Sequence, residues 1–146
     1  MISLSISNFT FRIEEEQSDY LQKHTENAHH VLLKTTVDLS GFEESELARN
    51  KSLSIAHISA YFLMNGLEEN DSRMIYFKSI TLYLLDRLLP ACLGYQWSVK
   101  CGNYSLVVSS DSIDDMKTSK FASFIEVSAN GGSNLVSFYL FTWMRK

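Results

Sequence analysis

The chain has 146 residues, the size of one ordinary domain, and its 45% of hydrophobic residues can form a core without disulfides or metals. We therefore expect a single globular domain over residues 1–146. Cys92 and Cys101 are too few for a disulfide framework and lack metal-ligand spacing, which indicates two ordinary thiols in a reducing compartment. No secretory signal is visible, and no apolar run approaches the ~18 residues of a membrane span. These observations predict a cytoplasmic protein that does not contact a membrane.

The formal net charge of −4 is unevenly distributed along the chain. Residues 14–46 contain nine acidic residues against two lysines, a local net charge of −7, so the remaining residues are together slightly basic. Two runs carry most of this charge, EEEQSD at residues 14–19 and FEESE at residues 42–46. Such a concentration indicates either a solvated segment that keeps the protein soluble or a negative patch that meets a basic partner.

The first part of the chain has strand composition interrupted by acidic loops. In residues 2–13, apolar residues alternate with serines, which predicts a half-buried strand with a bulge near Ser7 and Asn8, where the parity changes. Residues 14–28 are polar and predict a long connection with at most a short helical turn around 19–23. Residues 29–39 return to strand composition, and a second acidic loop follows them.

The middle of the chain is predicted to contain one long helix. Residues 52–64 are apolar on both faces and predict a central strand, although a buried helix fits the same run because periodicity alone does not separate the two. The helix is expected over about residues 71–89, with N-cap candidates at residues 70–72 and with Pro90 ending it. Its wide apolar arc predicts a mostly buried helix.

The remaining segments predict two hairpins. Residues 95–101 and 104–110 flank a two-residue turn in which Gly102 supplies a positive φ at the first position. Residues 121–129 and 134–144 flank the sequence NGGS. The resulting order, β-β-β-α-β-β-β-β, predicts an α+β fold in which a mainly antiparallel sheet of about seven strands, or a pair of sheets, packs on the long helix.

No residue pattern in the chain indicates a catalytic or metal site. His24, His29 and His30 could suggest a metal ion, but two adjacent histidines at the start of a strand would point to opposite faces. His57 lies between apolar residues and is interpreted as a core histidine with one hydrogen bond. The sequence contains no nucleophile elbow, phosphate-binding loop or calcium loop. We therefore predict no metal, no cofactor and no catalytic residue.

Three aromatic residues, Tyr139, Phe141 and Trp143, share one face of the last predicted strand, where bases could stack. Nucleic-acid binding also requires a basic groove, and the only charges beside this ladder are Arg145 and Lys146. We therefore predict no nucleic-acid partner. Because the opposite face of the strand is equally apolar, a core strand or a strand at a subunit interface fits better.

Three functional hypotheses follow. The first is a protein-binding inhibitor, such as an immunity protein that neutralises a bacterial toxin by occluding its basic, nuclease-like active site. Its partner-binding residues would be Glu14, Glu15, Glu16, Asp19, Glu43, Glu44 and Glu46. The second is a homodimeric chaperone or assembly adaptor that uses its apolar aromatic strands. The third is a small enzyme with a pocket near His57, Cys101 or the helix end.

Overall fold

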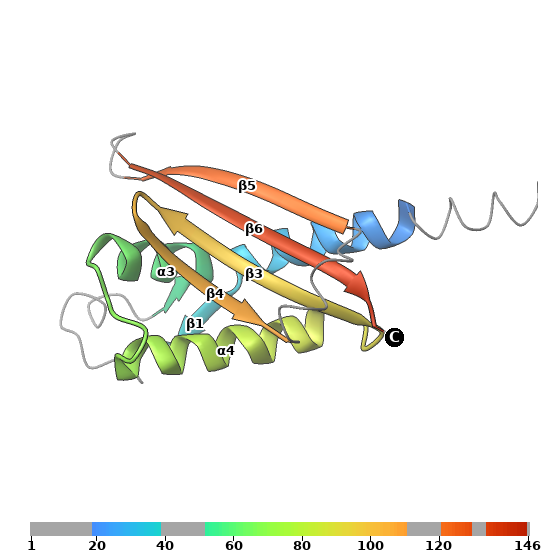
Figure 1. The fold of residues 1–146 in the computed structure, drawn as a ribbon, viewed down its shortest axis with the longest axis horizontal. Helices are drawn as coiled ribbons and strands as arrows, with labels where there is room; N and C mark the ends of the chain where they lie inside the picture. The colour runs from blue at the N-terminus through green and yellow to red at the C-terminus, as the bar shows by residue number, and fades with distance from the viewer. Residues whose placement is uncertain (1–18, 39–51, 111–120, 130–133, 146) are drawn as a thin grey trace, which may run out of the picture.

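The computed structural model describes residues 19–38, 52–110, 121–129 and 134–145 (Figure 1). The first described element is a helix over residues 19–34. It is followed by β1 (Thr36–Asp38), β2 (Ser52–Ser54), α3 (Ile55–Met64), α4 (Ser72–Leu88), β3 (Leu93–Cys101), β4 (Tyr104–Ser109), β5 (Phe121–Ala129) and β6 (Asn134–Met144).

The strands form two antiparallel sheets. β1 pairs with β2, and the other four strands form a sheet in the order β4-β3-β6-β5. The helices pack on one face of the four-stranded sheet, and the other face is turned toward the viewer in Figure 1. The class is therefore α+β, as predicted.

A chain of aromatic rings joins the helices to the sheet. The ring of Phe62 on α3 meets that of Phe77 on α4 at 5.6 Å, edge to face. Phe77 reaches Trp97 on β3 at 6.4 Å, and Trp97 reaches Phe138 on β6 at 6.3 Å. All four side chains are fully buried, and offset and edge-to-face rings at such distances add to the stabilisation from burial. The core therefore lies between the helices and the inner face of the sheet.

Buried polar contacts hold the 19–34 helix on the same inner face. The hydroxyl of Thr25 bonds that of Thr142 on β6 at 2.8 Å. His29 bonds two strands at once, with Nδ1 2.9 Å from the Ser123 hydroxyl and Nε2 3.3 Å from Nε1 of Trp97. Since the indole nitrogen can only donate, Nε2 accepts, and in the neutral ring Nδ1 carries the proton and donates to Ser123. Burial, together with the neighbouring charge of His30, lowers the pKa of His29 to about 4.

The predicted sheet of about seven strands is wrong, as is the order β-β-β-α-β-β-β-β. The strand predicted over residues 29–39 is wrong for most of its described part, because the helix continues to residue 34 and, of the described residues 29–38, Thr36–Asp38 forms the strand β1. The residues on the buried face of the 19–34 helix follow a helical spacing: Leu21, Thr25, Ala28, His29, Leu32 and Leu33. Because two of these residues are polar, the apolar pattern alone did not show the helix.

The central strand predicted over residues 52–64 is also wrong, and the helical alternative is confirmed. Only Ser52–Ser54 is extended, and α3 begins at Ile55. Ser54 is the N-cap, and its side chain accepts a hydrogen bond from the backbone N–H of His57 at 3.2 Å. The buried positions again have helical spacing and include one polar residue: Ile55, Ile58, Ser59, Phe62 and Leu63. The strand predicted over residues 2–13 lies outside the described residues.

The long helix predicted over about residues 71–89 is confirmed as α4, but the prediction that it is mostly buried is wrong. The side chain of Asp71 caps it by accepting from the N–H of Arg73 at 2.9 Å, and Pro90 follows its end. One face is buried, with Met74, Phe77, Thr81 and Leu85. Another face exposes Ile75, Tyr76, Leu82 and Tyr83. Ile80, Leu84 and Leu88 are partly buried against the core, so the helix is buried on one side and exposed on the other.

Both hairpin predictions are confirmed in their strands. β3 and β4 meet at a turn in which Gly102 has a φ of +59°. β5 and β6 pair antiparallel from Phe121 with Thr142 to Ala129 with Asn134, and the NGGS loop itself lies outside the described residues. Over the described parts of the chain, each helix is too short or too polar to cross a bilayer.

Candidate interaction surface

The face of the sheet that points away from the helices has an aromatic centre. Strand alternation places Phe124 of β5 and Tyr139 and Phe141 of β6 on this open face. The rings of Phe124 and Tyr139 are 5.0 Å apart, and those of Tyr139 and Phe141 are 6.2 Å apart and nearly parallel. Phe124 is 56% exposed. We call these three residues the aromatic cluster.

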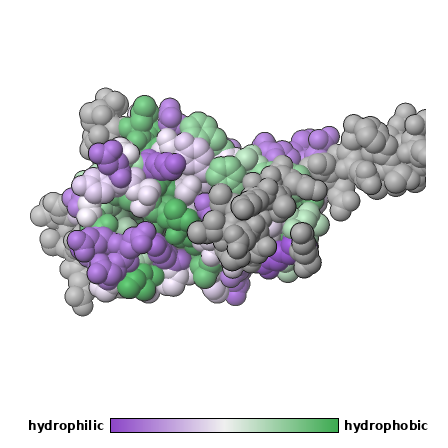
Figure 2. Space-filling view, in the orientation of Figure 1, coloured by the Kyte–Doolittle hydropathy of each residue, from purple (hydrophilic) through white to green (hydrophobic). Residues whose placement is uncertain are grey.

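The register of the β5–β6 pair explains why these rings meet. Phe124 lies directly opposite Tyr139, and the small residue Ala122 lies opposite Phe141. Such directly opposed residues on one face are the closest cross-strand neighbours. On the same face, Val107 on β4 and Leu135 on β6 are also exposed. Figure 2 shows hydrophobic side chains gathered between hydrophilic ones on this side of the molecule.

Two opposite charges flank the aromatic cluster. Lys100 of β3 and Glu126 of β5 both stand opposite Ser137, on either side of β6. They are the charged residues that the four strands contribute to the open face within the described residues. The Lys100 ammonium lies 5.6 Å from the centre of the Tyr139 ring, within the range of a cation–π contact. The face is therefore apolar in its middle and neutral in total charge.

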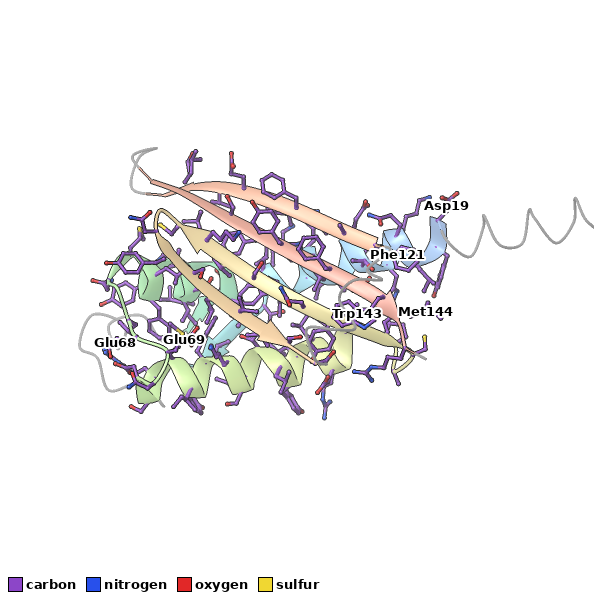
Figure 3. The ribbon with its side chains drawn as sticks, in the orientation of Figure 1. Asp19, Glu68, Glu69, Phe121, Trp143 and Met144 are labelled. Atoms are coloured by element: carbon purple, nitrogen blue, oxygen red, sulfur yellow. The ribbon has the colours of Figure 1, made fainter. Side chains whose placement is uncertain are left out.

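The three aromatic residues predicted to share one face of the last strand differ in their solvent exposure. Tyr139 and Phe141 are partly exposed, whereas Trp143 on the same side of β6 is buried. Figure 3 shows Trp143 beside Met144 at the end of the sheet. Its Nε1 is buried without a hydrogen-bond partner in the part of the chain that the structure describes. The opposite side of β6, with Val136, Phe138 and Leu140, lies in the core, so the prediction of a core strand holds for that side of β6.

A second apolar surface is the exposed stripe of α4, formed by Ile75, Tyr76, Leu82 and Tyr83. The guanidinium of Arg87 lies 4.5 Å from the centre of the Tyr83 ring and covers part of it. No aromatic pair links the residues of this stripe among the contacts of the described residues. Because it is also apolar and exposed, it provides a control surface for the open face.

A pocket of about 430 Å³ lies beside His57. It is lined mainly by apolar side chains of α3 and of the ends of β5 and β6, among them Ala60, Met64, Val127, Val136 and Phe138. His57 is exposed at this pocket, so its interpretation as a core histidine is wrong, and the histidine of the core is His29. The described lining contains no carboxylate and no thiol that could orient or activate His57. Its size suits a small ligand, and its polar lining consists of His57 and the hydroxyl-bearing residues Ser54, Tyr61 and Ser128.

The structure describes one of the seven residues of the predicted acidic surface. Asp19 is exposed at the start of the 19–34 helix, and Glu14, Glu15, Glu16, Glu43, Glu44 and Glu46 lie outside the described residues. Figure 3 shows Asp19 at the opposite end of the molecule from Glu68 and Glu69. The acidic side chains labelled there therefore do not form one patch.

The histidines and cysteines do not gather into a site among the described residues, where no group of three potential metal ligands occurs. His24 forms a hydrogen bond with the carbonyl of Leu88 at 3.2 Å, and the buried His29 forms one with Ser123. Both thiols are free, with Cys92 exposed and Cys101 buried.

The open face was only partly visible in the sequence. Alternation placed Tyr139 and Phe141 together, but Phe124, Lys100 and Glu126 join them only through the pairing of β3 and β5 with β6. The turn-forming sequence NGGS at residues 130–133 was the feature that could have placed Phe124 opposite Tyr139. No protein-family model matches this chain, and neither the curated proteins nor the solved structures contain a match.

Proposed function

We propose that this chain is a protein-binding adaptor that engages another protein through the open face of its four-stranded sheet. The observation that carries the proposal is the aromatic cluster of Phe124, Tyr139 and Phe141 on a face that the helices leave uncovered. Aromatic residues are enriched at the centres of protein interfaces because they bury a large area for few rotatable bonds. A contiguous exposed apolar patch on a folded protein is a common mark of a surface that binds another protein.

The charge of the open face specifies the chemistry of the partner. With one lysine and one glutamate on the face, the complementary surface is flat, apolar and close to neutral. A nucleic acid does not fit this description, since its phosphates require a basic groove. The partner of the adaptor is therefore a folded protein. The two free thiols favour a cytoplasmic setting for this binding.

A second candidate function uses the acidic segment instead. The net charge of −7 over residues 14–46 supports an inhibitor, such as an immunity protein, that occludes the basic active site of a nuclease-like toxin. In this proposal Glu14, Glu15, Glu16 and Asp19, with Glu43, Glu44 and Glu46, pair with Lys or Arg of the partner. Its binding would weaken as salt screens the charges.

An affinity capture with four forms of the protein separates the two candidates. The forms are the wild type, Phe124→Ser with Tyr139→Ser on the open face, Glu14, Glu15 and Glu16→Lys in the acidic segment, and a control, Ile75→Ser with Tyr83→Ser on α4. Partners are identified by mass spectrometry at low and moderate salt and then rebound as purified proteins. Circular dichroism melts establish that each variant folds.

The adaptor proposal requires that the identified partner bind the wild type and the α4 control but not the open-face variant. Loss of a basic partner only in the acidic-segment variant, and most clearly at moderate salt, would favour the inhibitor. Retention of every partner by the folded open-face variant would reject the adaptor.

A further inference from the structure

The open face is complementary to itself. Lys100 and Glu126 occupy the same row of the sheet, because both stand opposite Ser137 of the central strand β6. Neighbouring strands are ~4.8 Å apart, so the two charges lie at roughly equal distances on the two sides of β6. β6 therefore separates a positive side of the face from a negative side.

A two-fold axis along β6 would bring these charges together between two copies. Consider two copies whose open faces pack against each other, with the two-fold axis between them and parallel to β6. The rotation then places β3 of one copy opposite β5 of the other. It does not shift residues along the strands, so residues that pair across the sheet in one copy lie opposite the same set of paired residues in the other. Lys100 of one copy then faces Glu126 of the other, and the same pair forms a second time. An interface with this symmetry uses one patch on both copies and needs that patch to be self-complementary.

The apolar residues satisfy the same symmetry. Tyr139 and Phe141 of β6 lie along the axis, so each ring would pack against the same ring of the other copy. Phe124 shares a row with Tyr139 and with Ser98 of β3, so its bulky ring would face the small Ser98 of the other copy. Aromatic rings thus meet on the axis and a large side chain meets a small one beside it, a pattern that two aligned sheets can pack at a separation of about 10 Å.

We infer that the occupant of the open face is a second copy of this chain, packed about a two-fold axis along β6. This inference rests on the proposed function and makes it more specific, because it names the protein that the face binds. The apolar character of the face and the placement of its two charges both agree with it.

Charge exchange tests the arrangement directly. The molar mass of the intact chain is measured by sedimentation equilibrium over a range of concentrations for the wild type, Lys100→Glu, Glu126→Lys, and the α4 control Ile75→Ser with Tyr83→Ser. The wild type and the control should approach twice 16.7 kDa as concentration rises. Each single charge variant places like charges opposite each other twice and should weaken the dimer about tenfold or more.

Mixing the two charge variants gives the decisive result. In a mixed dimer, both rows again join opposite charges, so Lys100→Glu and Glu126→Lys should associate with each other about as tightly as the wild type does. A structural effect of either substitution would not be repaired by mixing. Recovery of the dimer mass in the mixture is the expected outcome.

Three outcomes would overturn the inference. A monomeric wild type at ~100 µM would exclude the second copy, while loss of partner binding in the open-face variant would still support the adaptor. A dimer that ignores both charge substitutions would reject the arrangement about β6. A dimer lost only in the α4 control would move the interface to that helix.

Discussion

The buried histidine makes this protein sensitive to mild acid. His29 accepts a hydrogen bond from the indole N–H of Trp97, and that bond is possible only when Nε2 carries no proton. Protonation would also place a charge in the core, and the pKa of His29 in the folded protein is lowered from 6.5 to about 4. The unfolded chain has no such restriction and binds the proton near the ordinary value.

The sign and size of the effect follow from this difference. As the pH falls below about 6.5, the unfolded state binds the proton and the folded state does not, so the free energy of unfolding decreases until the pH approaches 4. Each unit of pKa difference corresponds to about 1.4 kcal/mol, which gives a loss of roughly 2 kcal/mol between pH 7 and pH 5. Below pH 4 both states bind the proton and this contribution becomes constant.

The assay is urea unfolding followed by circular dichroism at pH 7, 6 and 5, with the wild type and His29→Gln compared. Glutamine keeps a polar group near Trp97 and Ser123 but cannot titrate, so the variant should be less stable at pH 7 and should lose less stability on acidification. Taking the difference between the two proteins removes the contributions of the carboxylates. His30→Gln, at an exposed neighbour, is the control and should retain most of the wild-type dependence. Parallel pH profiles for the wild type and His29→Gln would refute the reasoning.

Three further predictions test the fold by urea unfolding. Thr25→Val leaves the buried hydroxyl of Thr142 without its partner and should lower the free energy of unfolding by about 1 to 3 kcal/mol. The double variant Thr25→Val with Thr142→Val should lose less than the sum of the two single variants. Additive losses would contradict a direct bond. Asp71→Ala removes the cap of α4 and the ion pair to Arg73 and should cost about 1 kcal/mol; a change below a few tenths would show that the cap contributes little. Gly102→Ala places a Cβ in open space but at a φ of +59°, so it should cost roughly 1 kcal/mol through the backbone alone; an unchanged midpoint would contradict this.

Local features of the sequence were sufficient for the elements that depend on local physics. The Gly102 turn and the flanking alternation identified the β3 and β4 hairpin, because a two-residue turn of this kind needs a residue that adopts positive φ. The cap residue Asp71 and the helix-ending Pro90 bracketed α4 to within a residue or two. Such effects act between residues close in the chain, so no tertiary partner is needed to detect them.

The 19–34 helix, which the sequence did not predict, depends on contacts between distant residues. In the 19–34 helix, Thr25 and His29 are buried only because Thr142, Ser123 and Trp97 bond them. A search for apolar periodicity counts such residues as solvent-exposed, since an unpaired polar group in the core is costly. In α3 the polar residue Ser59 also interrupts the apolar pattern, although its partner is local, since its hydroxyl donates to the carbonyl of Ile55 one turn earlier at 2.8 Å.

The sequence by itself determined the α+β class, the last two hairpins, the long helix and the shared face of Tyr139 and Phe141, because each depends on spacing along one segment. Only the tertiary structure decided which side of β6 the helices cover. It also decided that Phe124, Lys100 and Glu126 surround Tyr139, since the strand order β4-β3-β6-β5 brings these residues together from three strands. A surface that assembles across strands depends on pairing, and pairing is settled by the burial of the whole sheet rather than by any one strand.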